Sequence, residues 1–84
     1  MNAEDITTTV KKSIARITSI DLGRISDHAS YKDDLGLDSL TILEIAVDAE
    51  YHFRVKISDD DLGEIRTVDD TVRMVQQYLS LQAA

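Results

Sequence analysis

The run from Leu40 to Phe53 carries leucine, isoleucine, valine and alanine at the spacing of an α-helix. When it is placed on a helical wheel at about 100° per residue, with Leu40 at 0°, nearly all of its apolar side chains share one wide arc. The remaining arc, between about 20° and 120°, holds the following residues: Thr41, Glu44, Asp48, Tyr51 and His52. A helix with so wide an apolar face must be covered by other elements, so this run predicts a helix over residues 39–53 within a packed domain.

The residues before this run predict where the helix begins. Asp38 is a strong N-cap residue, which places Ser39 at the first helical position. The first turn of a helix has unpaired backbone N–H groups and a partial positive charge, and it therefore favours a phosphate group. Ser39 is thus well placed to carry a phosphodiester, although a serine beside an N-cap is also an ordinary way to start a helix.

The N-terminal part of the chain has a helical pattern of its own. Residues 3–17 are predicted to form the first helix, because four apolar residues recur on one stripe: Ile6, Val10, Ile14 and Ile17. Asn2, followed by Asp5 three residues later, has the pattern of a capping pair at the start of this helix.

Two further capping patterns lie in the C-terminal part. Ser58 is followed by Asp61, and Thr67 is followed by Asp70. These patterns predict a short third helix and a longer fourth helix, over residues 59–63 and 67–80. The chain beyond the fourth helix is expected to fray. With no proline and three glycines in the chain, the four segments predict an all-α fold, a small four-helix bundle of three longer helices and one short helix.

The segment from residue 18 to residue 38 has no sustained period and is expected to form a long first loop. A loop of about twenty residues is uncommon in a compact domain unless it is anchored or functional. Scattered apolar residues are the expected anchors: Ile20, Leu22, Ile25, Ala29, Tyr31 and Leu35. Gly23 and Gly36 are expected to take turn conformations.

Length and charge limit what this chain can do. Its 84 residues are expected to form a single domain over residues 1–84, and the absence of cysteine excludes disulfides and thiolate metal sites. The net charge is −7, and residues 33–70 alone carry a balance of −9. Nucleic acid is therefore not an expected partner, whereas a basic protein surface is. No apolar run approaches transmembrane length, and the N-terminus lacks the apolar core of a signal peptide, so we expect a cytoplasmic protein without a membrane span.

Patterns for catalysis and for metal binding are missing from the sequence. Ser39 is not in a G-x-S-x-G elbow, and His52 lies about 20 Å farther along the same predicted helix. The only other histidine is His28. The acidic clusters that begin at Asp33 and Asp59 do not match the ligand spacing of an EF-hand loop. We therefore expect no catalytic residue and no metal site.

The segment Asp34-Leu35-Gly36-Leu37-Asp38-Ser39-Leu40, with Glu44 and Phe53 downstream, resembles the acyl carrier proteins. The resemblance covers nearly the whole chain without a large insertion. It implies that Ser39, next to the motif residue Asp38, is esterified by 4'-phosphopantetheine, whose thiol carries acyl groups as thioesters. Such a protein is a carrier without catalytic activity of its own, because the arm supplies the thiol and the protein supplies position and recognition.

The resemblance also implies partners for a monomeric carrier. A phosphopantetheinyl transferase would attach the arm, and acyl-transfer and synthase enzymes with basic docking patches would act on the acyl chain cargo. The residues implied to bind these partners are Leu40, Glu44, Val47, Asp48 and Glu50. For Leu40 and Val47, packing in the core is an equal alternative, and Leu43 is expected to be a core residue.

Several positions depart from the common fatty-acid carriers. Leu37 replaces a small residue, Thr41 stands where an acid is usual, and Arg54 and Lys56 add positive charge after the helix. Fatty acid synthesis and a specialised pathway, such as polyketide synthesis, therefore both stay open. An aminoacyl or peptidyl carrier protein is an alternative with the same arm and a different cargo. A helical interaction domain with Ser39 unmodified is a further alternative.

Overall fold

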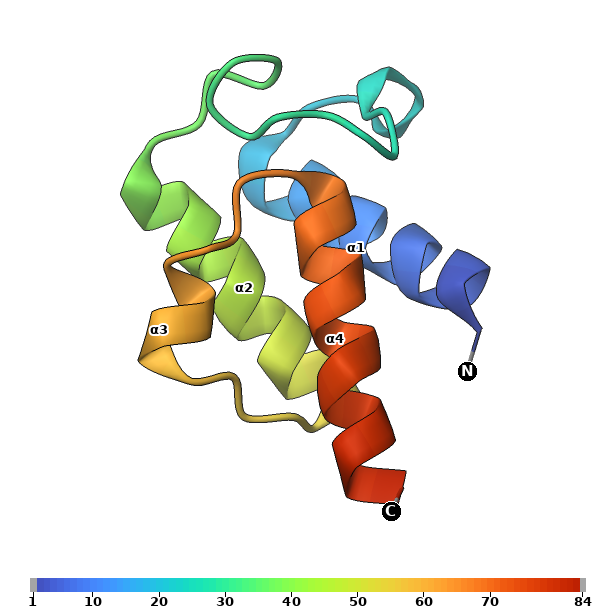
Figure 1. The fold of residues 1–84 in the computed structure, drawn as a ribbon. Helices are drawn as coiled ribbons and strands as arrows, with labels where there is room; N and C mark the ends of the chain where they lie inside the picture. The colour runs from blue at the N-terminus through green and yellow to red at the C-terminus, as the bar shows by residue number, and fades with distance from the viewer. Residues whose placement is uncertain (1, 84) are drawn as a thin grey trace.

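The computed structural model describes residues 2–83, and every regular element within them is helical. The elements are α1 (Ala3–Thr18), the 3₁₀-helix η1 (Leu22–Arg24), α2 (Ser39–Phe53), α3 (Asp59–Leu62) and α4 (Val68–Ala83), shown in Figure 1. The predicted all-α bundle of three longer helices and one short helix is confirmed. None of these helices combines the length and the hydropathy needed to cross a bilayer.

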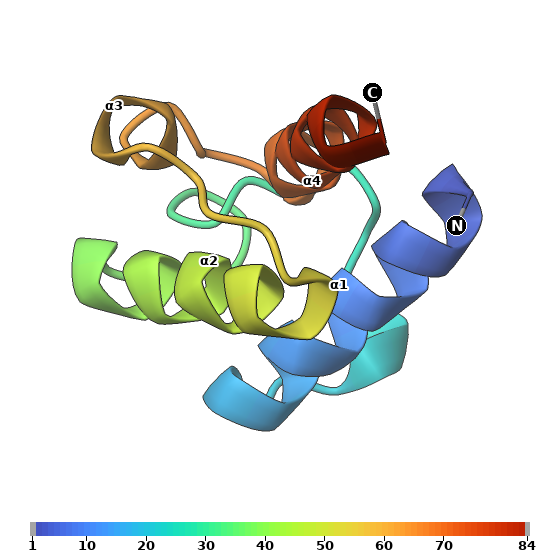
Figure 2. The ribbon, with the colours of Figure 1, turned by 90° about the horizontal axis from the view of Figure 1, so that it is seen from below.

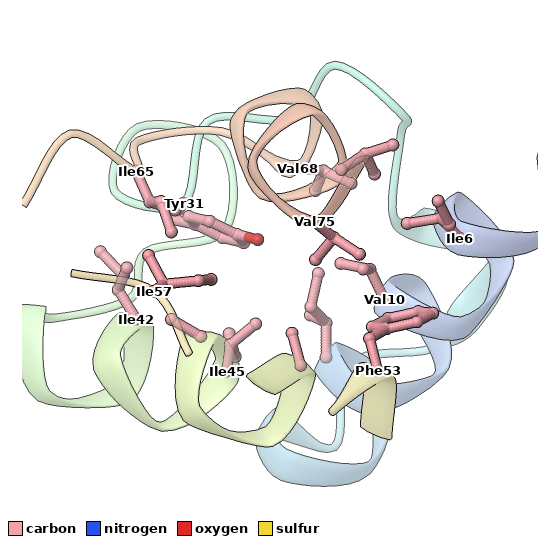
Figure 3. Packing of buried hydrophobic residues seen from close by; sticks show 14 of the residues in the cluster. Ile6, Val10, Tyr31, Ile42, Ile45, Phe53, Ile57, Ile65, Val68 and Val75 are labelled. Carbon is pink, nitrogen blue, oxygen red and sulfur yellow. The ribbon is translucent and has the colours of Figure 1, made fainter. Parts of the chain in front are cut away.

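The three longer helices pack on one another in pairs, and α3 is the peripheral element. Figure 2 shows α1 crossing α2, and α3 lying over α2 on the side away from α1. The core is made of aliphatic side chains from all three long helices together with Tyr31 and Phe53 (Figure 3). Because α3 buries none of its residues, the long helices hold the bundle together, and the space between α2 and α3 is left less filled.

Side-chain caps define where the helices begin. Asn2 accepts a hydrogen bond from the Asp5 N–H, at 2.8 Å, and Ser58 accepts one from the Asp61 N–H, at 3.2 Å. At the start of α4, the hydroxyl of Thr67 accepts from the Asp70 N–H at 3.0 Å. The carboxylate of Asp70 accepts in return from the Thr67 N–H at 3.1 Å. All the predicted capping pairs are therefore present, since each depends only on residues three positions apart.

The ends of three helices differ from the prediction. The first helix ends at Thr18, one residue after the predicted end. The third helix ends at Leu62, one residue before the predicted end. The fourth helix continues to Ala83, so the prediction that the chain frays after residue 80 is wrong for residues 81–83, while residue 84 lies outside the described residues. The side chain of Gln82 donates a hydrogen bond to the carbonyl of Arg54 at 2.7 Å, and this long-range contact ties the last turn of α4 to the end of α2.

The long loop between α1 and α2 is anchored, as predicted, by five of the six expected residues. Ile25, Ala29 and Tyr31 are buried in the core, and the partly buried Ile20 and Leu35 pack against it. Leu22 is 41 % exposed, so its predicted role as an anchor is wrong; it lies in η1, a short helix that no sequence pattern predicted. Gly36 takes the left-handed conformation with φ of 66°, which confirms a glycine-dependent turn, whereas Gly23 lies inside η1 without a positive φ.

Candidate functional site

Ser39 is the first residue of α2, and its side chain is exposed. Asp38 is the N-cap, as predicted, and its carboxylate accepts a hydrogen bond from the Thr41 N–H at 2.8 Å. This backbone hydrogen bond lowers the pKa of Asp38 below its ordinary value, so the cap is a carboxylate at neutral pH. The first turn of a helix has N–H groups without a partner inside the helix, and such a turn at Ser39 suits a bound phosphate.

The loop that leads to Ser39 is fixed by hydrogen bonds on both sides. The Leu37 N–H donates to the Tyr31 carbonyl at 2.9 Å. The Ser30 N–H donates to the Asp34 carboxylate at 2.7 Å. These contacts close the turn that contains Gly36, so the start of α2 is held in place instead of swinging on a free loop.

A second set of contacts ties this loop to the segment before α4. Ser30 forms an isolated antiparallel bridge with Thr67, in which the Tyr31 N–H donates to the Arg66 carbonyl at 2.9 Å. Inside the bundle, the Tyr31 hydroxyl hydrogen-bonds the hydroxyl of Thr71 on α4 at 2.6 Å. The loop before Ser39 is therefore joined both to the segment between α3 and α4 and to α4 itself.

A groove opens next to Ser39 between α2 and α3. Its volume is about 620 Å³, within the range of small-molecule sites. Aliphatic side chains contribute most of its apolar lining: Ile42, Leu43, Ala46, Leu62 and Ile65. Lys32, Asp33, Asp59 and Arg66 add charged groups to the lining. A flexible group attached to Ser39 would start at this groove, and an alkyl chain on that group could lie against its apolar wall.

The sequence did not predict this groove, because its residues come from segments that are distant in the chain. Ile42 and Ala46 read as ordinary core positions, and Leu62 and Ile65 belong to a region whose only signal was a capping pattern. How α3 lies beside the start of α2 is part of the tertiary structure, and no periodic pattern within the sequence indicates it.

The predicted apolar docking residues lie on the outside of α2. Leu40 is 66 % exposed and Val47 is 49 % exposed, which favours the docking interpretation over packing in the core. Leu43 is 45 % exposed, so the expectation that it is a core residue is wrong. The buried face of α2 is made instead by Ile42, Ile45, Ala46, Ala49 and Phe53.

The three predicted docking acids differ in their surroundings. Glu44 is exposed. Asp48 is half-buried, and its carboxylate pairs with the guanidinium of Arg16 on α1 at 2.7 Å. Glu50 accepts a hydrogen bond from the Ile57 N–H at 2.8 Å, so one of its oxygens holds the segment after α2 in place. Only Glu44 of the three therefore presents a carboxylate without an internal partner among the described residues.

The two histidines lie away from Ser39. His28 pairs with Asp69 at the start of α4, and this hydrogen bond raises the pKa of the imidazole. His52 lies on α2 more than three turns after Ser39. Among residues 2–83 there is no group of three or more histidine or acidic side chains that could hold a metal ion.

Comparisons with known proteins agree with this geometry. Residues 8–75 match the family described as "Phosphopantetheine attachment site". The meromycolate extension acyl carrier protein of Mycobacterium tuberculosis is 40 % identical over 74 residues, which cover 88 % of this chain and 64 % of that protein. An acyl carrier protein of an Exiguobacterium species is 35 % identical over 79 residues, which cover 94 % of this chain and 100 % of that protein. The chain thus spans less than two thirds of the mycobacterial relative but the full length of the other.

Solved structures of acyl carrier proteins have the same fold. The acyl carrier protein of Enterococcus faecalis superposes with a TM-score of 0.74 at 31 % identity, covering 93 % of this chain and 99 % of that one. An apo doublet acyl carrier protein from prodigiosin biosynthesis gives a TM-score of 0.78 at 26 % identity, covering 88 % of this chain and 36 % of that one. The chain therefore belongs to the family of phosphopantetheine-bearing acyl carrier proteins.

Proposed function

We propose that this protein carries acyl groups as thioesters on a 4'-phosphopantetheine arm attached to Ser39. The observation that carries the proposal is the position of Ser39, exposed at the first residue of α2 and lining the groove between α2 and α3. The arm supplies a thiol that forms and exchanges thioesters. N–H groups in the first turn of α2 would hold the phosphate oxygens of the arm, and the Asp38 cap keeps that turn formed.

The groove supplies a place for the cargo. Each methylene fully removed from water contributes about 0.8 kcal/mol, so methylenes lying on Ile42, Leu62 and Ile65 in the open groove would each contribute part of that amount. Partial burial there would also keep the thioester away from water until an enzyme draws the chain out.

Membership in the family supports the following proposed partners. A phosphopantetheinyl transferase attaches the arm, and acyltransferases and synthases of fatty acid or polyketide type exchange the cargo. The protein itself has no catalytic activity under this proposal, because neither histidine is placed to act as a general base on Ser39. A monomeric state and a cytoplasmic location remain predictions.

The mass of the intact protein purified from its native cells tests the proposed cargo. We expect species that carry one arm with a free thiol and species that carry one arm with an acyl group. Release of the acyl group by neutral hydroxylamine, with the arm retained, identifies a thioester. Aminoacyl groups on the arm would indicate the aminoacyl or peptidyl alternative, and a protein without any arm would support the unmodified interaction domain.

A further inference from the structure

Packing contributes little to the position of α3. This single turn, Asp59–Leu62, buries none of its residues, whereas Ile57 before it and Ile65 after it are buried in the core. Its backbone hydrogen bonds are local, such as the one from the Leu62 N–H to the Ser58 carbonyl at 2.9 Å. An isolated turn with few buried contacts opens easily, so one tertiary contact can decide where it lies.

The hydroxyl of Tyr78 on α4 makes such a contact. It donates a hydrogen bond to the carboxylate of Asp61 at 2.5 Å, and it accepts one from the Ser58 N–H at 3.2 Å. Within residues 2–83, these two hydrogen bonds are the ones that join residues 58–62 to another helix. A hydrogen bond from a hydroxyl to a carboxylate is about twice as strong as one between neutral groups. The partly buried Tyr78 side chain packs against the core, so it ties both the cap and the turn of α3 to a fixed part of the bundle.

Another side of α3 forms a wall of the groove beside Ser39. Asp59 and Leu62 line this groove, and their spacing of three residues places them on the same side of the turn. Asp61, which lies between them in the sequence, hydrogen-bonds Tyr78 instead. Figure 2 shows α3 and α4 on the same side of α2. A movement of α3 away from α2 would widen the groove, and the contact with Tyr78 opposes that movement.

We infer that Tyr78 is a positioning residue for the cargo, because its hydroxyl holds α3 in place as the wall of the α2–α3 groove. The inference rests on the proposed carrier function, in which an acyl chain on the arm at Ser39 lies in this groove. Loss of the hydroxyl would let α3 open more often and would expose the thioester of a chain that lies in the groove. A short acyl group does not reach far along the apolar wall, so the influence of Tyr78 depends on the length of the acyl chain.

Amide hydrogen exchange, followed by NMR on the full chain, tests the contact itself. Tyr78→Phe keeps the ring and removes the hydroxyl. We expect it to speed exchange of the Leu62 and Gly63 amides by about fivefold or more, because it raises the population of the open turn. The amide of Ile14, in the middle of α1, should change by a clearly smaller factor. If Ile14 and Leu62 change by the same factor, Tyr78 contributes only to overall stability and the inference is overturned.

Three further variants locate the effect. Tyr51→Phe is the matched control, since it removes a tyrosine hydroxyl from a side chain on α2 that is 85 % exposed, and it should leave exchange in α3 unchanged. Asp61→Asn keeps an oxygen that can accept from Tyr78, so exchange should rise by no more than about twofold. Asp61→Ala removes the acceptor and should approach the effect of Tyr78→Phe. Equal effects of Asp61→Asn and Asp61→Ala would count against the hydrogen bond as the cause.

A second measurement tests the role of Tyr78 toward the cargo. The wild-type protein and Tyr78→Phe are loaded by a phosphopantetheinyl transferase from octanoyl-coenzyme A or acetyl-coenzyme A, and cleavage of each thioester by hydroxylamine is timed by intact mass. We expect Tyr78→Phe to lose the octanoyl group about threefold faster or more than the wild-type protein. The acetyl group should leave both proteins at rates that agree within about 1.5-fold, because it gains little from the groove.

The outcomes separate this inference from the carrier function. If both proteins accept the arm and lose the octanoyl group at the same rate, the role of Tyr78 toward the cargo is overturned and the carrier function stands. An equal acceleration for octanoyl and acetyl groups would also overturn it, since the groove wall would then not be involved. If the wild-type protein accepts no arm, the carrier function fails and the role of Tyr78 toward the cargo fails with it. Circular dichroism melting checks that each variant is folded.

Discussion

Tyr31 connects the loop between α1 and α2 to the core through one buried hydroxyl. Its side chain and that of Thr71 are both fully buried, and their hydroxyl oxygens lie 2.6 Å apart. Burial raises the pKa of Tyr31 to about 12, so the phenol stays protonated and can donate at any physiological pH. Long surface loops are usually mobile, and this hydrogen bond fixes the loop before Ser39 to α4 through one pair of residues.

Removal of the Tyr31 hydroxyl should therefore be costly. We expect Tyr31→Phe to lower the free energy of unfolding by about 1–2 kcal/mol, because it leaves the Thr71 hydroxyl buried with only a long contact of 3.4 Å to the Thr67 carbonyl. Urea denaturation measures the change. The double variant Tyr31→Phe, Thr71→Val should recover part of the loss, since neither polar group is then left unpaired. If the double variant loses as much free energy of unfolding as the single variants Tyr31→Phe and Thr71→Val lose together, this account of the pair is contradicted.

Asp48 links α1 to α2 through its carboxylate. Burial acts to raise its pKa, but hydrogen bonds from Ser13 and Arg16 and the charge of Arg16 outweigh burial, so the pKa of Asp48 lies below its ordinary value. A carboxyl whose pKa is lower in the folded state contributes stability above its unfolded pKa of 3.8 and loses it as pH falls through the folded pKa.

The linkage predicts how an Asp48 variant responds to pH. Asp48→Asn should lower the free energy of unfolding by about 1 kcal/mol at pH 7, and its difference from the wild-type protein should shrink below about pH 4. Glu44→Gln, on the same helix but exposed and unpaired among the described residues, is the control and should change stability little at pH 7. Urea denaturation measures the free energy of unfolding of both proteins at pH 7 and below about pH 4. If Asp48→Asn lowers it equally at both pH values, the charge of Asp48 is not what stabilises the contact.

At the scale of elements, each long helix begins with a side-chain cap, but two helices end on unusual residues. Ser19 after α1 and Arg54 after α2 take the left-handed conformation, with φ of 62° and 56°. Glycine is the usual residue there, because a Cβ atom makes this conformation cost about 1–2 kcal/mol. The ends of α1 and α2 are therefore less stable than they would be with glycine at these two positions.

Glycine at the end of α2 should relieve this strain. Arg54→Gly is expected to raise the free energy of unfolding by about 0.5–1 kcal/mol, after the larger entropy of glycine in the unfolded chain is subtracted. Lys56→Gly is the matched control, since Lys56 is equally exposed and has no positive φ, and it should destabilise. Thermal melting ranks the three proteins, and a higher Tm for Lys56→Gly than for Arg54→Gly would contradict the interpretation.

The sequence predicted the helices better than their relations to one another. Helix starts were correct because Asn2, Asp38, Ser58 and Thr67 act on residues close to them in the chain. Leu22 and Leu43 were misassigned to the interior, since one apolar residue in a loop, or at the border of an amphipathic arc, carries no information about what covers it.

Other features could not be predicted from the sequence for the same reason. The Arg16–Asp48 pair joins residues of two different helices, and it gives the Asp48 carboxylate a partner within the bundle. The α2–α3 groove likewise depends on how α3 packs, which no local pattern determines.

At the scale of the whole molecule, the uneven charge opposes folding. Residues 33–70 carry twelve acidic residues and three basic residues, which are Arg54, Lys56 and Arg66. This segment includes the end of the loop before Ser39, α2 and α3. Acids crowded into a small folded domain repel one another more than in the expanded unfolded chain, and salt screens that repulsion.

Added salt should therefore stabilise the protein. We expect Tm to rise by about 5 °C or more between about 20 mM and about 500 mM sodium chloride at pH 7. Differential scanning calorimetry measures the shift. A flat or falling Tm would show that the acids are too far apart in the folded protein to repel one another.

The most direct measurement of the central claim is the position of the modification. The apo protein is incubated with coenzyme A and a phosphopantetheinyl transferase, and the product is analysed by intact mass and by fragmentation of the peptide that contains Asp38, Ser39 and Leu40. We predict a gain of the mass of one phosphopantetheinyl group, located on Ser39, and no gain for Ser39→Ala. Ser30, which lines the same groove as Ser39, and Ser58, which caps α3 as Asp38 caps α2, are controls in the same chain and should stay unmodified. An arm on another residue, or a Ser39→Ala protein that still accepts one, would contradict the account.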